Sequence, residues 1–175
     1  MFNQVLIQKV SQYCLHIENG KEWTSTVVIN EKYAAATLHC LPESMQQTGS
    51  KVIMCDGNEH QHETEIHGIN RMSDYVVFKK TNGTFDCVPD YVYPSLLDQY
   101  IVVGFPFGEK KPTVGSGHIT SISNGCQGYF YGDSGVWSGF SGGGIFYGRN
   151  GALMGIARST KQYSSELEMI SSQGD

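Results

Sequence analysis

The apolar positions of the chain fall into short runs of β-branched and aromatic residues, not into long stripes at helical spacing. Runs of this length, separated by glycine, proline, asparagine or aspartate, are typical of β-strands. Helix-like character is expected only from Tyr163 onward. The predicted strands are residues 5–8, 14–17, 25–30, 33–37, 51–55, 63–69 and 75–79, followed by 100–105, 117–123, 127–131, 143–147 and 152–157, with a hairpin turn at Asn124-Gly125.

The composition strengthens this all-β prediction. The chain of 175 residues contains 21 glycines, 10 tyrosines and 8 phenylalanines, and a protein with many strands and turns needs aromatic residues and residues that tolerate positive φ. A stretch containing proline and aspartate separates the two groups of strands. We therefore expect an N-terminal β-barrel in residues 1–82, a linker in residues 83–97, and a C-terminal β-barrel with a tail in residues 98–175.

The charge pattern argues against several classes of partner. A net charge of −5 without a long basic run offers no footprint for nucleic acid or for an anionic membrane. No stretch approaches the roughly 20 apolar residues of a membrane span, and the N-terminus lacks the regions of a secretory signal. The five cysteines are odd in number and irregularly spaced, which favours free thiols in a reducing compartment. We expect a cytoplasmic protein with a peptide or small-molecule partner.

Two predicted strands deliver groups suited to acid–base chemistry. Residues 25–40 form a predicted hairpin that ends in His39, and Asp74 stands directly before an apolar strand. A histidine near neutral pKa can accept a hydroxyl proton and return it to a leaving group, provided that a carboxylate fixes its tautomer. Each residue alone has an ordinary interpretation, as a hydrogen-bonded histidine and a turn aspartate. Asp56 and Asp86 are weaker substitutes for Asp74.

A glycine-rich turn supplies a candidate nucleophile. In Gly139-Phe140-Ser141-Gly142-Gly143 the glycines let the backbone turn tightly around Ser141 and expose its hydroxyl. The amides of Gly139 and Ser141 would then point at one place, where they can stabilise an oxyanion. A plain hairpin loop is the alternative; a phosphate loop is disfavoured because no Lys-Ser or Lys-Thr pair follows.

The chain order of His39, Asp74 and Ser141 matches the order of the chymotrypsin triad. Residues 26–40 resemble the trypsin-family segment that ends in Ala-Ala-His-Cys, residues 74–77 are similar to its Asp-Leu-Ala-Leu, and residues 139–143 match Gly-x-Ser-Gly-Gly. The resemblance to chymotrypsin-like serine proteases implies two six-stranded antiparallel β-barrels with the triad across their cleft. Residues 103–108, 115–122 and 151–157 resemble the protease domain of the HtrA group, so that the likeness spans roughly residues 20–160.

Three positions depart from the trypsin pattern. Gly132-Asp133-Ser134-Gly135 imitates the nucleophile motif but lacks its second glycine, so we assign Ser141 as the nucleophile. Thr24 stands where secreted relatives carry the disulfide partner of the cysteine at position 40, which implies that Cys40 is unpaired. Phe140 replaces the aspartate of the N-terminal activation switch, which implies an enzyme that matures without that switch.

The resemblance also implies a substrate pocket. Its predicted residues are Ser134, Gly135, Val136, Ala157, Arg158 and Ser159. Viral polyprotein proteases that cut after glutamine or glutamate usually carry a histidine where Ala157 stands, so this preference is not expected. Arg158 could attract an acidic side chain and Asp133 a basic one.

The predicted function is a serine endopeptidase that cleaves polypeptides without a cofactor. The compact, disulfide-free chain resembles proteases of positive-strand RNA viruses that process polyproteins in the host cytoplasm. The alternatives are a cellular HtrA-like protease domain and a catalytically silent fold kept as a binding module. No metal is expected, because the cluster of Cys55, His60, His62 and His67 lacks the paired spacing of a closed zinc site.

Overall fold

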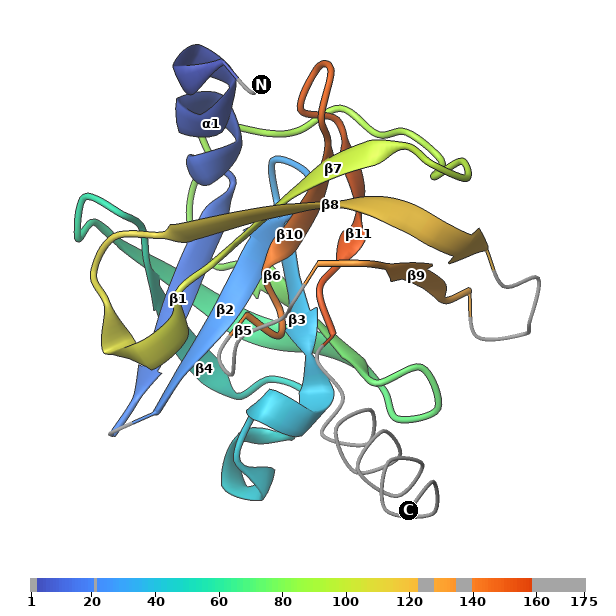
Figure 1. The fold of residues 1–175 in the computed structure, drawn as a ribbon. Coiled ribbons are helices and arrows are strands. Elements are labelled where there is room, and N and C mark those ends of the chain that lie inside the picture. The colour runs from blue at the N-terminus through green and yellow to red at the C-terminus, as the bar shows by residue number, and fades with distance from the viewer. Residues whose placement is uncertain (1–2, 21, 123–127, 135–139, 159–175) are drawn as a thin grey trace.

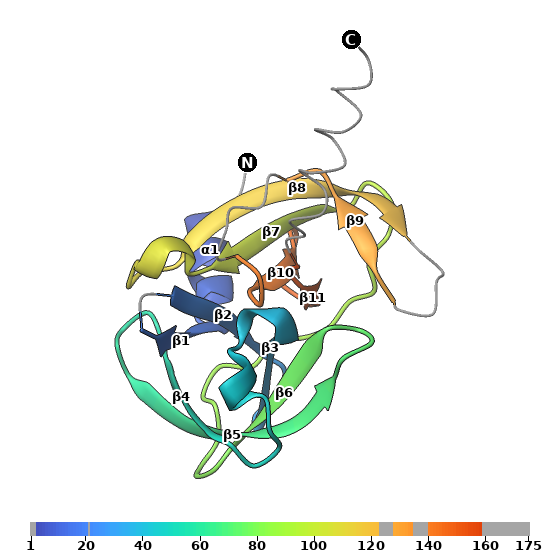
Figure 2. The same cartoon turned by 90° about the horizontal axis from the view of Figure 1, so that it is seen from below.

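The computed structural model describes residues 3–20, 22–122, 128–134 and 140–158 (Figure 1). The first half is a closed antiparallel barrel with the strand order β1-β2-β3-β6-β5-β4. In Figure 2 these six strands form a ring, with the second sheet on the side of β1 and β2. The barrel strands are β1 (Cys14–Asn19), β2 (Glu22–Val28), β3 (Tyr33–Thr37), β4 (Lys51–Cys55), β5 (Gln61–Asn70) and β6 (Tyr75–Lys80).

The second half is a curled sheet whose described part has five strands in the order β11-β10-β7-β8-β9. The all-β prediction with two barrel-like halves is therefore confirmed, although six strands are expected here and the described residues supply five. The predicted turn at Asn124-Gly125 lies outside the described residues, but the flanking strands pair antiparallel. The strands are β7 (Gln99–Gly104), β8 (Thr113–Ile122), β9 (Phe130–Gly132), β10 (Gly144–Tyr147) and β11 (Leu153–Ile156).

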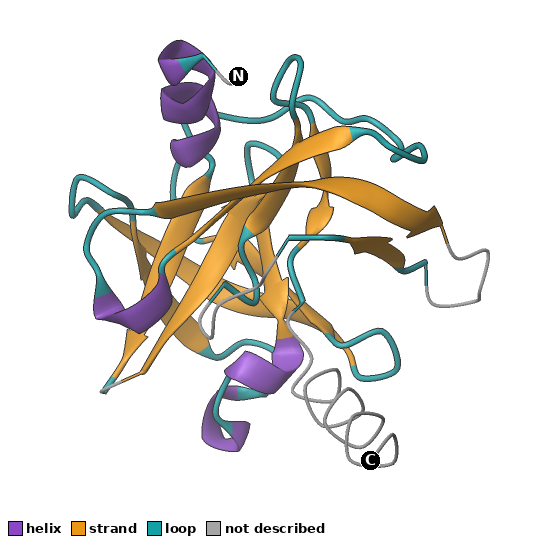
Figure 3. Cartoon of the chain, viewed as in Figure 1, coloured by secondary structure: helices purple, strands orange, loops and turns teal. Residues whose placement is uncertain are grey.

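One predicted strand is wrong. Residues 5–8 belong to the helix α1 (Gln4–Ser11), not to a strand. The Asn3 side chain caps this helix by accepting a hydrogen bond of 2.7 Å from the backbone N–H of Val5. Leu6 and Val10, four residues apart, pack against the core between the two halves, and this helical spacing outweighs the β-propensity of a short apolar run. Figure 3 shows that the other helical segments of the described residues are short; they are the 3-10 helices η1 (Leu38–Cys40), η2 (Glu43–Met45) and η3 (Pro106–Gly108).

One of the hydrophobic cores joins the two halves. In β1 the side chains of Leu15 and Ile17 point into the first barrel, whereas Cys14 points into the core that the barrel shares with the second sheet. Adjacent residues of a strand face opposite sides, so β1 is buried on both faces. The shared core is built from both halves and from α1, and contains Val10, Tyr13, Cys14, Val27, Ile101, Val103, Phe105, Phe146 and Leu153.

The segment between β6 and β7 runs along an edge of the second sheet. Tyr91 forms an isolated parallel bridge with Leu153 of β11, and the backbone N–H of Leu153 donates to the carbonyl of Asp90 at 2.6 Å. Among the described residues, no helix is both long and apolar enough to span a bilayer.

Candidate active site

His39 and Asp74 are brought together by the pairing of β3 with β6. In this antiparallel pair Thr37 lies opposite Tyr75, so the turn after β3 meets the residue before β6. The backbone N–H of Leu38 donates to the Asp74 carbonyl at 3.1 Å. The Asp74 carboxylate accepts from the His39 backbone N–H at 2.9 Å and lies 2.6 Å from His39 Nδ1. One carboxylate therefore fixes both the backbone and the ring of His39.

Asp74 is held in an uncommon backbone conformation. Its φ is +56°, in the left-handed region that aspartate and asparagine tolerate better than most residues. The preceding turn is closed by Asn70, whose side chain accepts from the backbone N–H of Ser73 at 2.9 Å. The Asp74 side chain is only 13% exposed while that of His39 is 44% exposed. The carboxylate is thus shielded from water while the imidazole remains accessible.

Arg158 also contacts Asp74. Its Nε donates to Oδ2 of Asp74 at 2.9 Å, the same oxygen that lies against His39 Nδ1. Its guanidinium lies 5.0 Å from the centre of the Tyr129 ring. From the sequence, Arg158 is expected in the substrate pocket as a partner of an acidic side chain. In the structure its charge is already paired with Asp74.

Cys40 interacts with two of the candidate catalytic residues, His39 and Ser141, which the sequence did not predict. The Thr37 hydroxyl donates to the Cys40 sulfur at 3.3 Å, and the thiol also hydrogen bonds with the side chains of His39 and Ser141. Thr24 donates to the Cys40 carbonyl at 3.0 Å, so the residue in place of the disulfide partner still anchors this turn. The described cysteines, Cys14, Cys40, Cys55 and Cys87, are free as predicted, and Cys126 lies outside the described residues.

These contacts shift two protonation equilibria. The pKa of His39 is raised to about 9, first by its hydrogen bond with Cys40 and then by Asp74, against the opposing effect of burial. Burial acts to raise the pKa of Cys40, but the hydrogen bonds from His39 and Thr37 outweigh it and lower that pKa. Both shifts favour an imidazolium beside a thiolate.

The turn at Ser141 requires glycine. Gly142 has a φ of +93°, and a Cβ there would overlap the carbonyl oxygen of Ser25 in β2. Its N–H donates to the carbonyl of Ala157 at 2.8 Å, and the N–H of Ala157 donates to the carbonyl of Gly143 at 2.8 Å. Ser141 itself is buried. The turn is therefore packed between the first barrel and the residue that follows β11. The Ser141 side chain interacts with the thiol of Cys40.

Ser134 occupies a different environment. Its hydroxyl lies 2.6 Å from the Tyr100 hydroxyl, which also accepts from the Ser134 backbone N–H at 3.0 Å. The neighbouring Asp133 accepts from the backbone N–H of His118 at 2.6 Å. These contacts point toward β7 and β8 and involve none of the candidate catalytic residues. The predicted site residues Gly135, Val136, Gly139 and Ser159 lie outside the described residues.

Comparisons with known proteins show the family and the fold of this chain. A family model described as the trypsin-like peptidase domain matches residues 24–156. The fold is similar to the crystal structure of the serine endoprotease from Yersinia pestis, with a TM-score of 0.74 and 20% identity, over 91% of this chain and 58% of that one. The chain thus spans less than two thirds of that protein. A comparison with curated proteins gives no match. The predicted chymotrypsin-like two-barrel fold is confirmed.

Proposed function

Because the chain belongs to the trypsin-like peptidase family, we propose that it is a serine endopeptidase with Ser141 as nucleophile, His39 as general base and Asp74 as the residue that orients His39. The Ser141 oxygen attacks the peptide carbonyl while the imidazole takes its proton, and the same imidazole then protonates the leaving amine. Water hydrolyses the resulting acyl-enzyme by the same route. The amides of Gly139 and Ser141 would stabilise the oxyanion.

The observation that carries this proposal is the double contact between Asp74 and His39. A carboxylate 2.6 Å from Nδ1 places the proton of the neutral imidazole on that nitrogen. The other ring nitrogen, Nε2, is then the one that can accept a proton from a hydroxyl. In the second contact, the His39 backbone N–H donates to the Asp74 carboxylate at 2.9 Å, so the carboxylate is also fixed relative to the backbone of His39. An ordinary surface ion pair does not require this second hydrogen bond.

Labelling with a fluorophosphonate, which reacts covalently with activated serine hydroxyls, tests this assignment. We expect the wild-type chain and Ser134→Ala to be labelled and Ser141→Ala not to be labelled. Each variant removes the serine hydroxyl of one of the two competing motifs, so each variant is a control for the other. Labelling lost in Ser134→Ala but kept in Ser141→Ala would contradict the assignment of the nucleophile. A folded wild-type chain that is never labelled would favour the binding module.

We propose a polypeptide substrate without a preference for acidic side chains. The Arg158 guanidinium is paired with Asp74 at 2.9 Å, and a paired charge attracts a further carboxylate weakly. Ala157, at the position where glutamine-specific viral relatives carry a histidine, is buried. A peptide-library cleavage profile tests both points, and enrichment of glutamate or glutamine before the cleaved bond would contradict them.

We propose the processing of a viral polyprotein in the host cytoplasm as the physiological role, since the free thiols of the described cysteines favour a reducing compartment. A cellular HtrA-like protease is the alternative. The two roles differ in their substrates. Cleavage at the junctions of the polyprotein that encodes the chain would support the first, whereas cleavage of unfolded cellular proteins without such junctions would support the second.

A further inference from the structure

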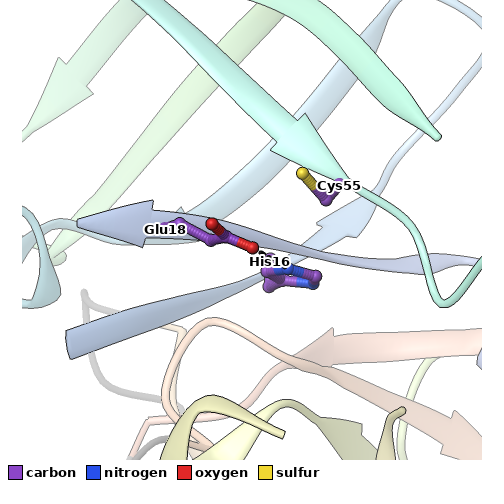
Figure 4. Close-up of side chains that lie close together, drawn as sticks. All are labelled: His16, Glu18 and Cys55. Carbon is purple, nitrogen blue, oxygen red and sulfur yellow. Dashed lines mark hydrogen bonds and ion pairs between the residues drawn. The ribbon is translucent and has the colours of Figure 1, made fainter. Parts of the chain in front are cut away.

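Three side chains suited to metal binding meet at the closure of the first barrel. His16 and Glu18 of β1 and Cys55 of β4 each offer a ligand atom, and these atoms lie within 4.8 Å of one another (Figure 4). β1 and β4 are joined in register by the single pair His16 and Cys55. None of these residues belongs to the proposed catalytic site.

The alternation of β1 places the cluster on the outer face of the barrel. Leu15 and Ile17 point into the barrel core, so His16 and Glu18 share the opposite face. The His16 ring is stacked on Trp23 with centroids 4.1 Å apart and an angle of 3° between the planes, and it also contacts Phe105 at 4.7 Å. Stacking covers the ring faces but leaves the ring edge, which carries the nitrogens, available to a ligand.

The distance between the donor atoms of His16 and Glu18 fits an ion with tetrahedral coordination. Nε2 of His16 and Oε1 of Glu18 are 3.3 Å apart, and two ligands at bond lengths of about 2.0 Å in a tetrahedral zinc site are separated by roughly 3.3 Å. The Cys55 sulfur, at no more than 4.8 Å from the other donor atoms, needs to move by about 1 Å to reach a zinc–sulfur bond length of about 2.3 Å. The exposed Glu18 side chain can adjust at little cost.

Acidic side chains also surround the cluster. Glu18 is itself a member of it, and Asp56 and Glu59 lie in the turn that directly follows Cys55. Lys110 is paired with Glu59 at 2.6 Å. His60 and His62 both contact Asp56, at 3.3 Å, on its Oδ2.

One ring nitrogen of the buried His16 side chain, Nδ1, has no hydrogen-bond partner among the described residues. His16 is 1% exposed. Leaving a buried polar atom unpaired is costly. Within the described residues, the ring is therefore positioned by its contacts with Trp23 and Phe105 and by the contact of Nε2 with Glu18.

We propose that His16, Glu18 and Cys55 bind one zinc ion that links β1 to β4 and closes the first barrel, with the fourth position open to water. An imidazole and a thiolate select zinc over magnesium or calcium, which prefer oxygen ligands. Binding forms a zinc–sulfur bond and releases the thiol proton of Cys55 to solvent. The site differs from the sequence cluster of Cys55, His60, His62 and His67, for which no metal is expected.

Zinc titration of the chelator-treated, reduced chain tests this proposal. We expect one zinc ion bound per chain after gel filtration and an increase of several degrees in the midpoint of thermal unfolding. Cys55→Ser and Glu18→Gln should each reduce the affinity at least tenfold and abolish the increase. Cys87→Ser is the matched control, because Cys87 is another partly buried free thiol and lies against Gln12. Cobalt should give a thiolate charge-transfer band that is lost in Cys55→Ser.

Three outcomes would overturn the proposal. One is a wild-type chain that retains no zinc after gel filtration. The second is equal loss of zinc binding in Cys55→Ser and Cys87→Ser. The third is binding that survives Cys55→Ser but is lost in Cys40→Ser, which would place the ion beside His39, or in a variant lacking both His60 and His62, which would place it at Asp56. Circular dichroism of each metal-free variant distinguishes a lost ligand from a lost fold.

Discussion

His39 owes its properties to the side chains on either side of it. Asp74 fixes the tautomer and position of its ring through two hydrogen bonds, and Cys40 contributes the largest upward shift of its pKa. In secreted relatives the corresponding cysteine is expected in a disulfide, where it cannot ionise. The free thiol of this chain therefore makes the acid–base behaviour of the candidate active site depend on a residue outside the triad.

The raised pKa of His39 predicts activity that increases with pH. Only the neutral imidazole can accept the Ser141 proton, so with a pKa of about 9 we expect kcat/KM to rise about tenfold per pH unit on the acidic side and to level off above that value. Cys40→Ala removes the largest cause, so the midpoint should move down toward about 6.5. The pH profile of kcat/KM measures this, with Cys87→Ala as control. Identical midpoints in all three proteins would contradict the role of Cys40.

Replacing Asp74 tests the orientation of His39. Asparagine has nearly the same shape, but its amide can donate to Nδ1 and so favours the tautomer whose Nε2 carries the proton. We expect Asp74→Asn to lower kcat by about 10⁴-fold with little change in KM. Asp86→Asn is the control, because Asp86 is exposed and was a weaker candidate from the sequence. A loss of less than about tenfold in Asp74→Asn would argue against a triad.

Among the elements, the turn between Phe140 and β10 depends most strictly on its sequence. Gly142 combines a left-handed φ with a backbone neighbour that leaves no room for a side chain. The turn carries Ser141 and is bonded to Ala157 at the end of β11. Glycine is the one residue that satisfies both the positive φ and the lack of space for a Cβ. The motif around Ser141 can therefore be recognised in the sequence before the fold is known.

A pair of glycine substitutions separates these two constraints. Gly83 also has a positive φ, of +65°, but no heavy atom lies within 4 Å of the place that a Cβ would occupy there. We expect Gly83→Ala to lower the free energy of unfolding by about 1 kcal/mol, and Gly142→Ala to cost clearly more and to abolish fluorophosphonate labelling. Urea denaturation measures both free energies. Equal costs in the two variants would show that the contact with Ser25 does not constrain the turn.

At the scale of the whole molecule, the core shared by the two halves positions the candidate site. Val27 of the first barrel and Phe146 of the second sheet belong to the same cluster, and the buried N–H of Phe105 donates to the Ser25 hydroxyl at 2.8 Å. His39 and Asp74 come from one half and Ser141 from the other. Their relative position therefore depends on this core.

A truncation in the shared core should weaken both halves together. Phe146 is fully buried, so Phe146→Ala is expected to lower the free energy of unfolding by about 3–5 kcal/mol. Phe78→Ala, a matched truncation in the core of the first barrel, should have a similar cost. We expect far-ultraviolet circular dichroism and tryptophan fluorescence to report a single coincident transition in each variant. Two separate transitions in Phe146→Ala would mean that the halves fold independently.

Much of the molecule could be predicted from local patterns. The strands 33–37 and 51–55 have the predicted ends, because alternation and turn residues are local signals. The segments around His39, Asp74 and Ser141 were predicted from short local motifs and their order along the chain, and the Ser141 motif also reflects a local backbone constraint at Gly142. The helix α1 was missed, since a short apolar run has no clear period and its burial against Phe146 and other distant residues decided its form.

The sequence by itself determined the two-barrel fold and the free state of the four described cysteines, and it predicted the three segments that carry the candidate triad. Only the tertiary structure decided which side chains surround them. The contact of Arg158 with Asp74 joins residues 84 positions apart, and Cys40 reaches Ser141 across the two halves. His16 meets Cys55 only where the barrel closes. Such contacts depend on how distant strands pair and pack, and neither spacing nor composition encodes that pairing locally.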